Sequence, residues 1–260
     1  CKTHGVRGHL EHEHIVQMVA EYPEDERQAR AYGKFQHLIG LVFKRFSRQI
    51  HVIPPFVVNP RDFTVYHLLD PHPRNNDAGI WLAVNEKGTK FIVDELWVKP
   101  EDVKQLAYLI KNKNSQFNVV HMGGDPSMFI EDQHTQRSLA KMLSDEGLTY
   151  IPATKMRAAS DKRIETALNY TEVNGFMVRA PELYIFDTCK RTIFEFEHYR
   201  WEDWTGKTAE KHDRKEKPVD KDDHTIESVG RALIIEPVFI PFVQRNNLGV
   251  VSNSDLDPYA

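Results

Sequence analysis

The chain has 260 residues, of which 40% are hydrophobic and 28% are charged, and its formal net charge is −4. This composition is typical of a globular protein with one large domain. The slightly acidic balance excludes a nucleic-acid binder that depends on an overall positive charge. The two cysteines exclude a disulfide framework and a cysteine-based zinc site, and they indicate a reducing, cytosolic setting. No apolar run approaches the roughly 18 residues that cross a bilayer, so we expect no membrane partner.

The chain divides into three parts by composition. Residues 1–50 are mostly polar, and we expect them to be a segment or linker that follows another domain. Residues 51–240 begin with a proline-broken connector, continue with regular apolar patterns, and are predicted to form the main domain. Residues 241–260 show no periodicity and are predicted to be a tail.

Strand and helix patterns alternate along the main domain. Apolar runs bounded by turn residues predict strands over 64–70, 77–98 (two strands with a turn at 85–88), 117–121 and 149–152. Helical spacing and capping residues predict helices over 101–113, 131–146, 160–173, 187–200 and 223–233. Asn174-Gly175 and 180–182 indicate a small hairpin region. Hairpin-linked strands followed by strand–helix alternation predict an α/β fold with a mixed β-sheet flanked by helices.

Acidic residues stand at the ends of two predicted strands. Asp70 ends the first strand of the domain, and Asp125 follows a later strand in a Gly-Gly turn. In open α/β sheets ligand sites gather beyond the strand ends, so these two carboxylates are expected to converge. Each acid alone is more typical of an ordinary turn than of a ligand site.

A third acidic group opens the last predicted helix, at KDDHTIESVGRAL (221–233). Asp223 and Glu227 lie four residues apart and therefore share a helix face. Acids at this position also cap helices and favour the helix dipole, so a purely structural role stays open. Clustered carboxylates repel one another, and divalent ions such as Mg²⁺ or Mn²⁺ remove that cost. Two such ions, roughly 3.5–4 Å apart, serve in phosphodiester cleavage.

The order of these motifs resembles the RNase H-like nuclease domain of phage terminase large subunits. The segments that carry the resemblance are AYGKFQHLIGLVFKRF (31–46), YHLLDPHPRNNDAGIWLAV (66–84), VVHMGGDPS (119–127), LYIFDTCKRTIFEFEHYRW (183–201) and KDDHTIESVGRAL (221–233). Three positions depart from the family pattern. Glu227 stands where the family usually has Asp, Ala232 where it usually has Tyr, and Leu69 where a small residue is common.

The resemblance implies a two-metal endonuclease that cuts concatemeric viral DNA into genome lengths during packaging. It implies catalysis by Asp70, Asp125 and Asp223, and two Mg²⁺ or Mn²⁺ ions. The implied metal ligands are Asp70, Asp125, Asp222, Asp223, His224 and Glu227. The implied partners are double-stranded DNA, an ATPase domain in a longer protein, a portal protein and a small terminase subunit. The implied location is the host cytoplasm, at the procapsid. The chain has no GxxxxGK[ST] motif, so we expect the ATP-driven motor elsewhere in that longer protein.

A local basic patch is a candidate DNA contact. Lys155, Arg157, Lys162 and Arg163 cluster in KMRAASDKR and could hold phosphate groups. A solvated helix start explains the same residues without DNA.

Two other functions stay open. A different RNase H-like nuclease, such as a Holliday-junction resolvase or a transposase core, would share the acidic site but leave residues 31–46 unexplained. A non-catalytic module that docks on a portal or small subunit would use the acids only as caps.

Overall fold

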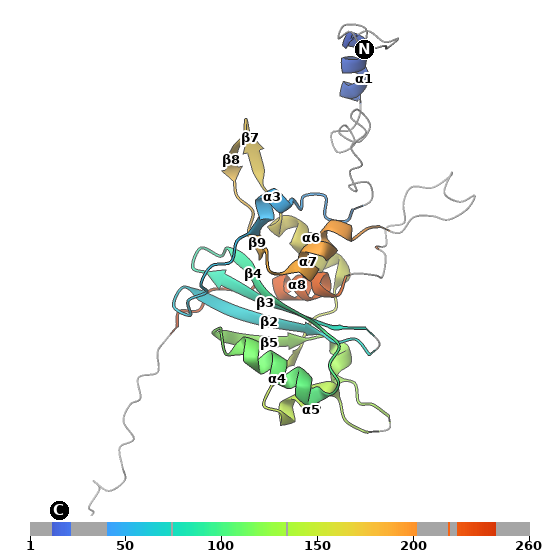
Figure 1. Cartoon of the computed structure of the whole chain (residues 1–260), viewed down its shortest axis with the longest axis vertical. Coiled ribbons are helices and arrows are strands. Elements are labelled where there is room, and N and C mark those ends of the chain that lie inside the picture. The colour runs from blue at the N-terminus through green and yellow to red at the C-terminus, as the bar shows by residue number, and fades with distance from the viewer. Residues whose placement is uncertain are drawn as a thin grey trace, which may run out of the picture.

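The structure, a computed structural model, describes residues 12–21, 41–73, 75–133, 135–201, 218 and 223–242. A seven-stranded sheet in the order β1-β9-β4-β3-β2-β5-β6 forms its centre, and a two-stranded hairpin, β7-β8, stands apart from it (Figure 1). The strands are β1 (Val52–Ile53), β2 (Phe63–Asp70), β3 (Asp77–Asn85), β4 (Lys90–Val98), β5 (Val119–Gly124), β6 (Ile151–Pro152), β7 (Thr171–Val173), β8 (Phe176–Arg179) and β9 (Leu183–Phe186).

Helices cover both faces of the sheet. The helices are α1 (His12–Glu21), α3 (Arg48–His51), α4 (Val103–Asn114), the 3-10 turn η2 (Pro126–Phe129), α5 (Leu139–Asp145), α6 (Arg157–Ala167), α7 (Lys190–His198) and α8 (His224–Ile234). In Figure 1, α6, α7 and α8 lie on one side of the sheet and α4 and α5 on the other. Within the described part of the chain, no helix has the length and apolar composition of a membrane span.

The sheet is mixed, as the sequence predicts. Strand β3 runs antiparallel to both of its neighbours, β2 and β4, whereas all other neighbouring strands of this sheet pair in parallel. Seven of the eight residues of β2 are buried, because helices cover both faces of the central strands. This double coverage explains why the strand reads as a nearly continuous apolar run.

Most elements lie where the sequence predicts them. Strand β2 and the β3–β4 hairpin match closely, and helix α4 begins after Asp102, whose side chain accepts a hydrogen bond from the Gln105 amide. Hairpin β7–β8 turns at Asn174-Gly175. Both residues have positive φ, 53° and 80°, which suits the twist of a two-residue hairpin turn.

Three expectations were wrong in detail. The helix expected over 131–146 is shorter, because Gln136 has a left-handed φ of 51° and the Ser138 side chain caps α5. The helix expected over 160–173 begins earlier, and Ser160 lies inside it, buried. Residues 180–182 do not form a second hairpin, since β8 and β9 belong to different sheets.

Residues that precede and follow the main domain's strands in the sequence also pack against the sheet and its helices. Phe43 is buried and packs beside Phe196, with ring centroids 5.5 Å apart. Near residue 240, the Ile240 amide donates to the Thr64 hydroxyl at 2.7 Å. Part of the expected 1–50 linker therefore shares the core, while the division of the whole chain into domains stays a prediction.

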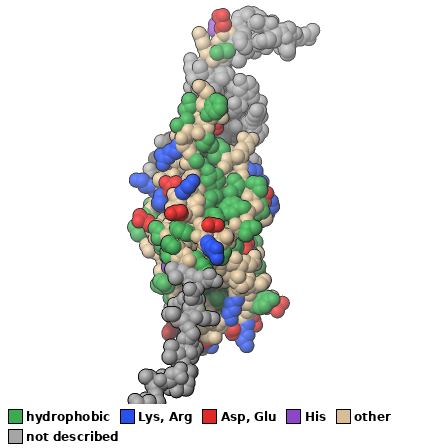
Figure 2. Space-filling model, turned by 90° about the vertical axis from the view of Figure 1, so that its left-hand side faces the viewer, with side chains coloured by type: hydrophobic (Ala, Val, Ile, Leu, Met, Phe, Trp, Pro, Cys, Tyr) green, Lys and Arg blue, Asp and Glu red, His purple; other side chains and the backbone are tan. Residues whose placement is uncertain are grey.

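One face of the molecule is rich in exposed apolar side chains. Figure 2 shows hydrophobic side chains gathered along the side that carries the β7–β8 hairpin in Figure 1. Phe176 and Val178 of this hairpin are 76% and 68% exposed. The hairpin therefore contributes little to the core, which lies between the central sheet and the helices on both of its faces.

Helices α6 and α8 approach closely at Gly230. A Cβ atom placed there would lie 2.7 Å from the Cβ atom of Ser160, closer than real side-chain carbons come. The small residue at 230 thus sets the separation of the two helices that carry the charged residues described below.

Replacing Gly230 with Ala should lower the free energy of unfolding by about 1–3 kcal/mol, because the added methyl group overpacks the α6–α8 contact. Urea unfolding measures this change. The same substitution in a Ser160→Gly background should cost less, since the clashing carbon is gone. An equal cost in both backgrounds would contradict the proposed contact.

Candidate metal centre

Asp70 and Asp125 lie side by side at the ends of neighbouring strands. Strands β2 and β5 are parallel, with Leu69 paired to Gly124, and the Asp125 amide donates to the Leu69 carbonyl at 3.0 Å. Both carboxylates are largely buried, with 7% and 4% of each residue exposed. Two acids that the sequence places 55 residues apart thus meet at one edge of the sheet.

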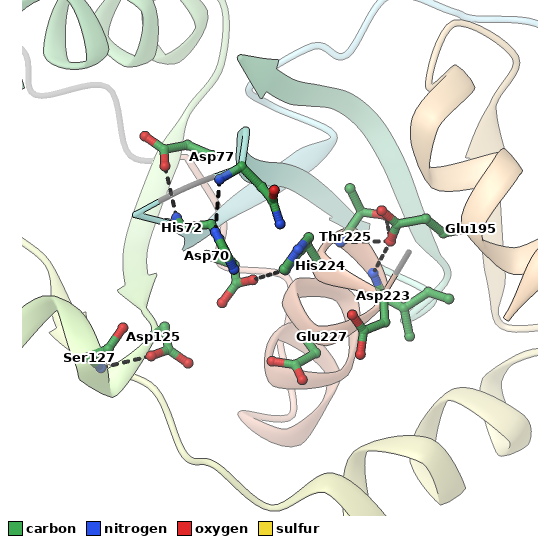
Figure 3. Close-up of polar contacts among 12 residues, drawn as sticks. Asp70, His72, Asp77, Asp125, Ser127, Glu195, Asp223, His224, Thr225 and Glu227 are labelled. Carbon is green, nitrogen blue, oxygen red and sulfur yellow. Dashed lines mark hydrogen bonds and ion pairs between the residues drawn. The ribbon is translucent and has the colours of Figure 1, made fainter. Parts of the chain in front are cut away.

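Helix α8 brings a third carboxylate to this edge. Glu227 lies one turn into α8, and Figure 3 shows its side chain directed toward the same space as Asp70 and Asp125. One carboxylate oxygen from each of the three lies within 4.8 Å of the other two. Clustered hard oxygen donors of this kind suit Mg²⁺ or Mn²⁺.

Arg231, one turn further along α8, lies among these three acids. Its Nη1 atom donates to Asp70 at 2.8 Å, and its Nη2 atom donates to both Asp125 and Glu227 at 2.5 Å. Only 4% of the arginine is exposed. Its guanidinium offsets the repulsion that would otherwise oppose this cluster.

Asp223 lies at the edge of the cluster rather than within the group of three. Its carboxylate accepts a hydrogen bond from Nη2 of Arg157 at 2.8 Å, and Nη1 of the same arginine donates to Glu227. Asp223 is only 2% exposed. Arg157, on α6, therefore joins the two acids of α8 in the way that Arg231 joins Glu227 to the strand acids.

His224, the first residue of α8, contacts the cluster at Asp70. Its Nδ1 atom donates to Asp70 at 3.0 Å, and its ring lies against those of His72 and Trp97. Asp222, another expected ligand, lies outside the described residues.

The pKa values of these groups follow from their contacts. The hydrogen bond to Asp70 raises the pKa of His224 despite burial. Burial raises the pKa of Glu227 in spite of its arginine partners. Burial also acts against the ionised form of Asp125, but hydrogen bonds from Ser127 and the charge of Arg231 bring its pKa below the usual value.

Helix α8 is capped by a residue that the sequence analysis missed. Asp223 occupies the N-cap position, yet its side chain makes no capping hydrogen bond. The fully buried carboxylate of Glu195, on α7, instead accepts hydrogen bonds from the amides of Thr225 and Ile226, at 2.8 and 3.1 Å (Figure 3). The carboxylate of Asp223 is therefore not used by the helix end.

Helix α7 is held in the same manner. The carboxylate of Glu95, on β4, accepts hydrogen bonds from the amides of Arg191 and Thr192, each at 2.8 Å. A half-buried acid from the sheet thus fixes α7, and a fully buried acid from α7 fixes α8. An acid between the buried residues of a helix such as α7 is the sequence signal that would have indicated Glu195.

The basic residues expected to contact DNA differ in their surroundings. Arg157 faces the acids of α8, and Arg163 pairs with Glu182 at 3.6 Å. Lys155 and Lys162 are exposed, and the charge of Lys155 contributes to the low pKa of Asp125. Lys155 also lines a cavity of about 100 Å³ that reaches Glu227 and Arg231.

Comparison with solved structures finds the same fold in phage large terminases. The large terminase of a thermophilic bacteriophage, in complex with ATP-gamma-S, matches 86% of this chain with a TM-score of 0.58 and 18% identity. A second crystal structure of that protein matches 75% of the chain with a TM-score of 0.57 and 19% identity. The P22 large terminase nuclease domain matches 75% of the chain and 92% of its own length, with a TM-score of 0.56 and 14% identity.

The chain has the fold of a large-terminase nuclease domain. The fold expected from the sequence motifs is thereby confirmed. No protein-family model matches the sequence, and no curated protein matches it. The chain spans about half the length of the thermophilic phage's large terminase, 45–52% in the structures above, whereas it matches nearly all of the P22 nuclease domain.

Within this terminase nuclease fold, replacing Glu195 with Ala should lower the free energy of unfolding by about 2–3 kcal/mol, because the buried amides of Thr225 and Ile226 lose their acceptor. Chemical denaturation measures the change. Glu197→Ala, on the same helix but at a more exposed position paired with Arg48, is the matched control and should cost at most about 1 kcal/mol. Equal losses would show that Glu195 does not cap α8.

Proposed function

We propose that this chain is a metal-dependent endonuclease that cuts double-stranded DNA during viral genome packaging, as the nuclease part of a phage large terminase. The observation that carries the proposal is the convergence of Asp70, Asp125 and Glu227 at the strand ends of a terminase nuclease fold. The alternative in which the acids of α8 serve only as caps does not account for Asp223, whose side chain makes no capping hydrogen bond while Glu195 accepts from the helix amides.

The protein residues have separate roles in this proposal. Asp70, Asp125 and Glu227 hold two Mg²⁺ or Mn²⁺ ions, with Asp223 completing the set. When bound, such ions lower the pKa of water and stabilise the leaving oxygen of a phosphodiester. His224 orients the Asp70 carboxylate through its hydrogen bond. Asp222 is proposed as a further ligand on the sequence motif alone.

The charge of the site favours uptake of cations. Four carboxylates, of Asp70, Asp125, Asp223 and Glu227, face two guanidinium groups, of Arg157 and Arg231. Among these six groups the carboxylates exceed the guanidinium groups by two, and divalent ions are strongly attracted to such an excess in a largely buried place.

Contacts with the DNA backbone are proposed for the basic patch. Lys155 and Lys162 are exposed and positioned to bind phosphate groups, and Lys155 lies close enough to the acids to hold a phosphate beside them. Arg157 and Arg163 would take part only by giving up their acidic partners.

The wider setting follows from the full-length relative. The thermophilic phage's large terminase, solved with ATP-gamma-S bound, is about twice as long as the matched segment. We propose that the present chain works beside such a nucleotide-binding part, with a portal protein and a small subunit, in the host cytoplasm.

Asp70→Asn, Asp125→Asn and Glu227→Gln should each reduce plasmid cleavage in Mn²⁺ or Mg²⁺ by roughly a hundredfold or more, because each removes a metal ligand. Agarose gels of supercoiled plasmid measure this. Asp145→Asn, at an exposed position on α5, is the control and should cut like the wild type. Unchanged cleavage by all three site variants would refute the proposal, and strict preference for four-way junctions would favour a resolvase.

Lys155→Gln in an Asp70→Asn background should weaken duplex binding and reduce the slope of log K against log salt by about 1, because one phosphate contact is lost. Fluorescence anisotropy with a labelled duplex, repeated over a range of salt concentrations, measures both. Lys104→Gln, at an exposed position on α4 across the sheet, is the matched control. A slope unchanged by Lys155→Gln would remove this residue from the DNA-binding surface.

A further inference from the structure

Every carboxylate oxygen of the three converging acids already accepts a hydrogen bond from a protein group. One oxygen of each acid contacts Arg231. The other oxygens contact different donors: His224 for Asp70, the Ser127 amide for Asp125, and Arg157 for Glu227. Of all these donors, Arg231 alone reaches all three acids.

The position of Arg231 matches that of a cation bound by the acids. Its Nη2 atom lies 2.5 Å from both Asp125 and Glu227. A divalent ion that used the same two oxygens would lie at about 2.0–2.6 Å from each of them, which is the space that Nη2 occupies. The ion and the guanidinium also repel each other, so both cannot hold these oxygens at once.

We propose that Arg231 is a built-in counterion, which holds the three acids together without metal and which a divalent ion displaces from Asp125 and Glu227. This inference rests on the proposed metal-dependent function of the same site. The planar guanidinium presents several donors in a fixed fork, which allows one side chain to join three carboxylates. The cavity of about 100 Å³ that Arg231 lines gives the displaced side chain room to turn.

A counterion and an orienting residue have opposite effects on metal binding. If Arg231 competes with the ion, removing it leaves the acids with more uncompensated charge and tightens binding. If Arg231 only orients the carboxylates for the ion, removing it weakens binding, as loss of outer-sphere partners does.

Calorimetric titration with MnCl₂ alone distinguishes these two roles. Arg231→Gln should bind Mn²⁺ about tenfold more tightly than the wild type, a coupling of ordinary size between two sites or ligands. Its melting temperature should fall in EDTA and recover in Mn²⁺. Arg48→Gln removes an equally charged arginine from a bidentate pair with Glu197, away from the site, and should bind Mn²⁺ like the wild type.

Arg231→Lys provides a second variant if Arg231→Gln does not fold. It keeps the charge but cannot span three carboxylates, so its Mn²⁺ affinity should lie above that of the wild type and below that of Arg231→Gln. Adding Asp70→Asn to either variant should abolish the gain in Mn²⁺ affinity. This result would place the bound ion at the acid cluster.

The outcomes separate this inference from the proposed function. Equal or weaker Mn²⁺ binding by the Arg231 variants, with plasmid cleavage by the wild type intact, would overturn the counterion proposal and leave the nuclease proposal standing. If neither the wild type nor any variant binds Mn²⁺, the metal site itself fails and both proposals fail with it.

Discussion

The repulsion among four carboxylates in one largely buried place is the constraint on which the rest of the structure depends. Asp70, Asp125 and Asp223 are each less than 10% exposed, so water screens them poorly. Arg157 and Arg231 supply the compensating charge, one from α6 and one from α8. The same two helices meet at Gly230. The ion pairs and the close helix contact therefore both require the same placement of α6 against α8.

The strand side of the site was predictable because it depends on local pattern and on a general property of sheets. Asp70 and Asp125 follow apolar runs, and the ends of parallel strands share one edge. The helix side of the site was not predictable, because the rotation of α8 decides whether Asp223 or Glu227 faces the strand acids. That rotation depends on how the mostly buried helix packs in the tertiary fold, and it directs Glu227 to the strand acids while Asp223 meets Arg157.

The features that sequence reasoning missed all depend on contacts between distant residues. Glu195 caps a helix through Thr225, 30 residues later, and Arg231 joins acids up to 161 residues away. The late start of α5 depends on one left-handed residue, Gln136, which no apolar pattern marks. Periodicity therefore indicated the elements and the sheet, while the charge network required the tertiary fold.

The separation of the acids along the chain has a consequence for synthesis. Asp70 and Asp125 lie in strands that emerge from the ribosome long before Arg231 does, and domains form as their residues become available. Until α8 docks, these two acids lack their guanidinium partner and repel each other at the sheet edge. The nascent chain therefore holds this pair of acids without a compensating charge until α8 has been made and has docked.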